Sequence, residues 1–145
     1  MFVENLKETL NLGKKLSQKL NPHSIVLLKG PIGAGKTSFV QGIAEGLSIP
    51  EDITSPTFAL SHHYNSGKIP LIHLDLYRLE SISSAKEVFF SEEEEALQNK
   101  AILVIEWPEL IEPLIDNFWE IKISYAKNSG RNYEIRDPKN LLTFS

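Results

Sequence analysis

The sequence predicts an α/β fold with a mainly parallel central sheet, helices on its faces and added antiparallel hairpins. Two short apolar runs, residues 24–28 and 101–105, have the length and composition of buried strands. A glycine-rich turn follows the first run and leads into a segment with helical spacing, which is the strand, loop and helix order of a parallel sheet. Other segments alternate in polarity around turn-forming residues, and these predict the hairpins.

Length, composition and charge narrow the class of protein. A chain of 145 residues has the size of one domain, so we expect residues 1–145 to form a single domain with its own core. The chain has no cysteine, which excludes disulfides, thiolate metal sites and cysteine nucleophiles. Neither a signal-peptide pattern nor an apolar run of membrane-spanning length occurs, so we expect a cytoplasmic protein with no membrane partner. The net charge of −4 does not attract nucleic acid, and any RNA role is expected to run through a partner.

The N-terminal segment is expected to form a helix over residues 5–20. Asn5 followed by Glu8 is a capping pattern at a helix start, and the Asn21-Pro22 pair ends the helix. The buried strand at residues 24–28 comes next. The leucines expected near one face of this helix are Leu6, Leu10, Leu16 and Leu20.

Two hairpins are expected beside the parallel strands. Residues 53–64 alternate like a strand in their second half, and after a turn the chain returns as residues 69–76. The second hairpin joins residues 119–125 to residues 132–136 around a turn at 128–130. The side chains expected on one side of the first hairpin's leading strand are Phe58, Leu60, His62 and Tyr64.

Between the hairpins, residues 79–100 mix Ser, Glu and Lys with few large apolar side chains. We expect a loop there, followed by a helix at about residues 92–99. The four glutamates from Glu92 to Glu95 are interpreted as the solvated start of that helix, where carboxylates favour the positive end.

Residues 30–37 match the phosphate-loop pattern G-x-x-x-x-G-K-[ST]. The glycines let the backbone direct successive N–H groups at an anion, and the following helix adds its positive N-terminal end. Lys36 is then expected to reach the β- and γ-phosphates of a nucleotide, and the Thr37 hydroxyl to bind Mg²⁺. A glycine-rich turn without a ligand is the alternative, but the strand before and the helical spacing after favour a P-loop NTPase-like domain. The residues expected to bind the nucleotide in this stretch are Gly30, Gly33, Ala34, Gly35, Lys36, Thr37 and Ser38.

Two carboxylates compete to complete the metal site. Glu106 ends an apolar run of five residues, which is how a P-loop enzyme brings an acidic residue to the carboxyl edge of its parallel sheet. Asp75 ends residues 71–74, a weaker version of the same arrangement. Either residue is alternatively an ordinary strand-end carboxylate that faces water. The four histidines are assigned no metal, because neighbouring His62 and His63 point to opposite faces of a strand and the other two have no spaced partner.

Four motifs in this order resemble the TsaE (YjeE) family of bacterial ATPases. They are Gly30-Pro31-Ile32-Gly33-Ala34-Gly35-Lys36-Thr37, Thr54-Ser55-Pro56-Thr57-Phe58, Asp75-Leu76-Tyr77-Arg78-Leu79 and Ile105-Glu106-Trp107-Pro108-Glu109. The resemblance covers most of the chain. The chain departs from the family pattern at Pro31, where an acidic residue is usual, and over residues 81–98, which lack a glycine-containing pattern.

The resemblance implies a role for each motif. In that family Thr37 and Glu106 would hold Mg²⁺, Lys36 would bind the phosphates, and Asp75 would be needed for activity. Trp107 would lie near the nucleotide, which would be ATP. The residues of a switch-like loop would be Ser55, Pro56 and Thr57. The resemblance further implies that the protein acts with TsaB and TsaD, which install threonylcarbamoyl on the adenosine beside the anticodon of tRNA, so that it meets tRNA only through that complex.

Two other classes of protein use the same loop. A small kinase of a metabolite or nucleotide is one alternative, although three arginines are few for clamping two phosphorylated substrates. A GTP-dependent switch is the other, but the Asn-Lys-x-Asp element that reads guanine is missing at Asn99-Lys100, so adenine is favoured.

We expect slow ATP hydrolysis by the protein alone. The motifs place no arginine against the γ-phosphate, and a partner that supplies one accelerates phosphoryl transfer by about 10³ to 10⁵. Arg78 acting from within the chain is the alternative.

Overall fold

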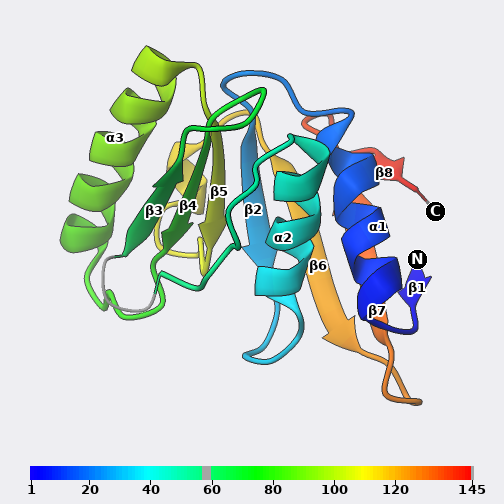
Figure 1. Cartoon of the computed structure of the whole chain (residues 1–145). Coiled ribbons are helices and arrows are strands. Elements are labelled where there is room, and N and C mark those ends of the chain that lie inside the picture. Colours follow the sequence, from blue (N-terminus) through cyan, green and yellow to red (C-terminus); the bar gives the residue numbers. More distant parts are fainter. Residues whose placement is uncertain (57–59, 145) are drawn as a thin grey trace.

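The computed structural model describes residues 1–56 and 60–144, which form one mixed sheet with helices on both faces (Figure 1). The helices are α1 (Leu6–Ser17), α2 (Lys36–Gly46), α3 (Ile82–Asn99) and the short 3₁₀ helix η1 (Glu112–Leu114). The strands are β1 (Phe2–Val3), β2 (Ile25–Lys29), β3 (Ser61–Tyr64), β4 (Leu71–Asp75), β5 (Ile102–Glu106), β6 (Trp119–Tyr125), β7 (Arg131–Arg136) and β8 (Leu142–Thr143).

The sheet confirms the predicted fold class. Its order is β1-β7-β6-β2-β5-β4-β3, with β8 paired to β7. The four central strands β6, β2, β5 and β4 are parallel, whereas β3 and β7 pair antiparallel with their neighbours as the two predicted hairpins. Since parallel strands end at a common edge, the loops that follow β2, β4 and β5 meet there.

Alternation along the central strands divides the core into two layers. Figure 1 shows α1 and α2 side by side, with α3 at the opposite end of the sheet. One layer packs α1 and α2 on the sheet and includes Val26, Leu28, Leu71, Ile102 and Val104. The other lies under α3 and the segment around η1 and includes Leu27, Ile72, Leu74, Leu103 and Ile105. Strands buried on both faces explain why residues 24–28 and 101–105 are continuously apolar.

A helix is confirmed at the N-terminus, but it ends at Ser17 rather than at residue 20, and its buried face differs in part from the prediction. Asn5 caps α1 by accepting from the Glu8 N–H at 3.0 Å. Leu12 and Leu16 are buried, whereas Leu6 is 61% exposed. The glycines Gly13 and Gly42 decide this orientation, because a Cβ at Gly42 would lie 2.4 Å from the Leu10 carbonyl oxygen of α1. Close backbone contact between α1 and α2 therefore sets the face.

The prediction of a helix over residues 92–99 is confirmed, but the loop predicted before it is wrong. A single helix, α3, begins at Ile82, where the Ser81 hydroxyl accepts from the Ser84 N–H at 3.1 Å. The four glutamates from Glu92 to Glu95 consequently lie within the helix rather than at its start. A helix that covers one layer needs only a narrow apolar stripe, and small residues supply part of it here, which weakened the sequence signal. The buried residues of α3 are Ala85, Phe89 and Ala96.

The first hairpin is shorter than predicted. β3 begins at Ser61, because Leu60 has a φ of 62°, outside the extended region. Phe58, expected on the same strand face, lies outside the described residues. In residues 1–56 and 60–144, no helix combines the length and apolarity that a membrane crossing requires.

Candidate functional site

The phosphate loop joins β2 to α2 at the carboxyl edge of the parallel strands. Gly33 and Gly35 have φ values of 82° and 101°, which only glycine adopts readily. Gly30 meets a different constraint, since a Cβ there would lie 2.9 Å from the Ile123 carbonyl oxygen. The glycines of the pattern are thus required by the backbone path and by the close approach of β6.

Lys36 is the first residue of α2 and is buried. Its Nζ donates to the Gly30 carbonyl oxygen at 2.7 Å and lies 4.0 Å from the centroid of the Trp107 ring. Burial lowers the pKa of the Lys36 amine, and the nearby carboxylates, Glu106 first, oppose that shift only in part. The amine is therefore held in a desolvated place where an anion would stabilise its charge.

Strand pairing brings the two predicted carboxylates together. Asp75 and Glu106 are direct partners in the parallel register of β4 and β5, and Leu28 of β2 pairs with Glu106 on its other side. Glu106 is buried and Asp75 is partly exposed. Burial raises the pKa of Asp75, and the Glu106 charge adds to the shift, whereas the Tyr77 N–H, which donates to Asp75 Oδ1 at 2.9 Å, opposes it.

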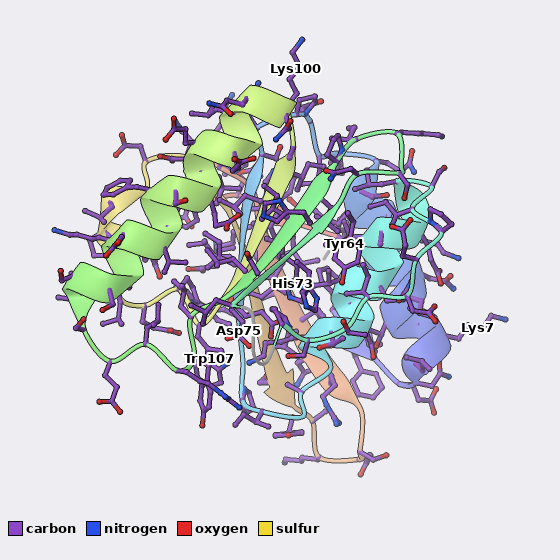
Figure 2. All side chains as sticks on the ribbon, turned by 60° about the vertical axis from the view of Figure 1, so that its left-hand side comes forward. Lys7, Tyr64, His73, Asp75, Lys100 and Trp107 are labelled. Atoms are coloured by element: carbon purple, nitrogen blue, oxygen red, sulfur yellow. The ribbon has the colours of Figure 1, made fainter. Side chains whose placement is uncertain are left out.

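His73 is a member of this site that the sequence analysis missed. Its Nε2 lies 2.5 Å from Glu106 Oε2, and the imidazole is fully buried. Figure 2 shows His73 near the middle of the molecule, with Asp75 and Trp107 further toward its lower edge. The available signal was a polar residue inside the apolar run of residues 71–74, two positions before Asp75 and therefore on the same strand face.

Trp107 directly follows β5 and takes an unusual backbone conformation, with a φ of 56°. The Trp107 ring packs against the Tyr77 ring at a centroid distance of 4.9 Å, and it also contacts the Lys36 amine. A bulky residue in the left-handed region carries strain, which is common at binding sites. The indole thus forms a wall beside the lysine.

Lys36, Asp75, Glu106 and Trp107 line one pocket of about 270 Å³. It brings together residues from the phosphate loop, both strand ends and the segment before β3. Of the predicted switch-like loop, Ser55 and Pro56 line the pocket and Thr57 lies outside the described residues. The lining residues are Ile32, Gly33, Lys36, Thr37, Ser55, Pro56, Leu60, Asp75, Tyr77, Arg78, Glu106 and Trp107.

A second hollow lies on the other side of the phosphate loop, between the start of α1 and the β6–β7 turn. Arg131, which lines this hollow, stacks 4.5 Å above the Tyr125 ring, and the Tyr125 hydroxyl donates to the Ile32 carbonyl oxygen at 2.8 Å. Arg131 Nη2 also donates to the Gly33 carbonyl oxygen at 3.4 Å. The lining residues include Asn5, Leu6, Thr9, Ala34, Gly35, Ser38, Gly130 and Arg131.

The residues present fit a magnesium ion that is shared with a phosphate ligand. Mg²⁺ is usually held by one or two carboxylates together with substrate phosphates and water. Glu106 and Thr37 line the same pocket and offer a carboxylate and a hydroxyl, with Asp75 beside them. Across residues 1–56 and 60–144, no three His, Cys, Asp or Glu side chains cluster as an all-protein metal site.

Comparison with known proteins adds a family match. The family model described as threonylcarbamoyl adenosine biosynthesis protein TsaE matches residues 3–133. The tRNA threonylcarbamoyladenosine biosynthesis protein TsaE of a Nostoc species is 41% identical over 137 residues, covering 93% of this chain and 83% of that protein. The Treponema pallidum protein of the same name is 40% identical, covering 89% of this chain and 92% of the other.

A solved structure shares the fold. The crystal structure of Bacillus subtilis YdiB superimposes with a TM-score of 0.71 at 30% identity, covering 92% of this chain and 80% of that one.

Proposed function

Because this chain belongs to the TsaE family, we propose that it is a P-loop ATPase that supports threonylcarbamoyl modification of the adenosine next to the anticodon of tRNA. The observation that carries the ATPase proposal is the convergence of the phosphate loop with two strand-end carboxylates on one pocket. Residues 1–145 act as a single domain in this proposal.

Each side chain of the pocket has a role in hydrolysis. The Lys36 amine, desolvated in the loop, binds the β- and γ-phosphates of ATP. Thr37 and Glu106 would hold Mg²⁺, which when bound would supply positive charge against the phosphates. Asp75 pairs with Glu106 in the sheet register and would be needed for activity as the second carboxylate beside the metal site. Ser55, Pro56 and Thr57 form a loop that responds to the γ-phosphate.

The two hollows on either side of the loop suit a nucleotide lying across it. The γ-phosphate is assigned to the pocket that contains Glu106, and the base and ribose to the hollow lined by Ser38 and Arg131. Adenine is proposed because the Asn-Lys-x-Asp element that reads guanine is incomplete at Asn99-Lys100. In addition, Lys100 lies at the end of the molecule opposite Asp75 and Trp107 (Figure 2).

TsaB and TsaD are the proposed partners, and tRNA is met only through them in the cytoplasm. Among the described residues that line the γ-phosphate pocket, Arg78 is the only arginine. Phosphoryl transfer gains about 10³ to 10⁵ in rate from a well-placed arginine. We expect a partner to supply that arginine, which gives slow turnover by the protein alone and faster turnover in the complex; Arg78 acting from within the chain is the alternative.

Steady-state ATP hydrolysis with and without TsaB and TsaD tests this proposal. The expected result is slow hydrolysis alone and clear acceleration by the two proteins together. An Arg78→Ala variant decides between an arginine of this chain and one supplied by a partner. Rapid turnover by the isolated protein, or transfer of the γ-phosphate to an added metabolite, would instead favour the small-kinase alternative.

A further inference from the structure

We propose that His73 is a positioning residue, whose Nε2 holds one oxygen of Glu106 so that the other oxygen is presented to Mg²⁺. This inference rests on the proposed function, since it takes Glu106 to be a metal ligand. His73 is fully buried, so it acts through Glu106 rather than by touching the nucleotide.

The place of His73 in the sheet supports a polar role. Side chains alternate along a strand, so His73 and Asp75 share the face of β4 that also carries Leu71. On β5 the same face carries Ile102 and Val104, both aliphatic core residues. The imidazole is a polar side chain among these aliphatic neighbours, and its contact with Glu106 at 2.5 Å accounts for it.

Register places His73 behind the carboxylate. Asp75 lies beside Glu106 at the carboxyl edge, whereas His73 pairs with Val104, two residues deeper in the sheet. Glu106 also lines the pocket. Its carboxylate therefore stands between a buried donor on one side and the ligand space on the other. Donors of this kind orient carboxylate ligands, and their loss typically weakens metal affinity 10- to 100-fold.

The hydrogen-bond inventory predicts which ring nitrogen carries the proton. An ionised carboxylate only accepts, so Nε2 must donate to Glu106. His73 Nδ1 is buried and has no hydrogen-bond partner in the part of the chain that the structure describes. With the proton on Nε2, Nδ1 carries only a lone pair, so no buried N–H group is left without an acceptor.

Nuclear magnetic resonance of ¹⁵N-labelled protein without ligand tests the contact. A proton on Nε2 of His73 supports the proposal, and a bare Nε2 overturns it. This readout does not depend on nucleotide, metal or activity.

Metal affinity tests whether His73 orients Glu106 for a metal ion. Free Mn²⁺ is measured by electron paramagnetic resonance as it binds to the protein saturated with ADP. We expect His73→Leu to weaken Mn²⁺ binding about 10- to 100-fold, while ADP binding in a chelator stays at the parent value. His73→Gln places an amide N–H where Nε2 was and restores most of the affinity. His73→Asn carries the same amide on a shorter side chain that does not reach Glu106, so it resembles the leucine variant.

Controls separate the possible failures. His63→Leu, which removes a histidine that pairs with Glu92 on α3, leaves Mn²⁺ affinity unchanged. Should the leucine variant not fold, the glutamine and asparagine variants carry the comparison. Equal Mn²⁺ affinity in all His73 variants overturns the role of His73 alone, whereas a parent protein that binds neither ADP nor Mn²⁺ overturns the proposed function.

Discussion

At the scale of single residues, the Lys36 amine shows how the phosphate loop prepares for an anion. Its charge is disfavoured by burial, and its partners are a backbone carbonyl and the Trp107 ring. A phosphate would replace these weak partners with charge-assisted bonds.

Lys36→Ala is therefore expected to weaken ATP binding roughly 10- to 100-fold, because a hydrogen bond to a charged group contributes about 1.5–3 kcal/mol. Isothermal titration calorimetry measures the change. Lys86→Ala, which removes an exposed lysine of α3, is the matched control and should bind ATP like the parent. Equal affinities for the two variants would contradict the assignment of the loop.

Trp107 provides a fluorescent report on the same pocket. Its indole lines the pocket and contacts Lys36, so ATP binding should change its emission. The other tryptophan, Trp119, is buried in the core layer under α1 and α2. We expect Trp119→Phe to keep the ATP-dependent change and Trp107→Phe to lose it, as measured by titration with ATP. Survival of the signal in Trp107→Phe would show that Trp107 only caps the core.

At the scale of elements, the β6–β7 hairpin supports the phosphate loop from the side. The Tyr125 hydroxyl and Arg131 both bond carbonyls of the loop, and the two side chains stack on each other. This clamp was not apparent in the sequence, because Tyr125 and Arg131 lie 93 and 98 residues from the loop residues that they bond.

Tyr125→Phe removes the hydroxyl and keeps the stacking ring. The expected result is a loss of ATP affinity of about 3- to 10-fold, since a typical hydrogen bond contributes about 0.5–1.5 kcal/mol. Thermal stability should change little. Ser124→Ala, at the neighbouring exposed position of β6, is the control for affinity. An unchanged affinity in Tyr125→Phe would mean that the clamp does not order the loop for binding.

An ion triad ties β2 to η1 and β6. Lys29 Nζ lies 2.5 Å from Glu112 Oε1 and 2.8 Å from Glu120 Oε2. Partial burial alone would raise the pKa of Glu120, but its bond with Lys29 outweighs that effect, and the pKa falls below its usual value. The pKa of Lys29 is raised, because the bonds to Glu112 and Glu120 outweigh burial.

The sign of the pH dependence follows from the depressed pKa of Glu120. The unfolded chain binds the proton more readily, so the stability from Glu120 is present above its unfolded pKa of about 4.5 and is lost as pH falls through the folded value. Glu120→Gln should lower the free energy of unfolding by roughly 1–2 kcal/mol at pH 7, a value between those of exposed and buried salt bridges. The difference from the parent should shrink below about pH 4.5. Urea unfolding at several pH values measures it, and a difference independent of pH would contradict the ionic contribution.

At the scale of the whole molecule, the net negative charge favours an indirect contact with tRNA over a direct one. The net charge of −4 gives no general attraction to a polyanion. We therefore expect the isolated protein to retain little tRNA in filter binding at physiological salt, and retention to appear when TsaB and TsaD are added. Tight binding by the protein alone, with a steep dependence on salt, would show a direct contact.

Much of the fold and site could be predicted because the signals are local. The glycines, lysine and threonine of the phosphate loop act within eight consecutive residues, and β2 and β5 are apolar runs that are buried whichever strands they pair with. The resemblance to the TsaE family, confirmed by the family match, rests on four such local motifs. The sequence by itself therefore determined the fold class, the phosphate loop and the carboxylates at the strand ends.

The tertiary structure decided what depends on pairing and packing between distant segments. The register of β4 on β5 places Asp75 beside Glu106 and brings His73 to the same carboxylate, although 33 residues separate His73 from it. Contact between Gly13 and Gly42 sets which face of α1 is buried. Packing of α3 against β4 and β5 stabilises a helix that begins ten residues before its glutamates. Periodicity reports only that one face of a segment is apolar, whereas the identity of the neighbour is set by the free energy of packing the whole sheet.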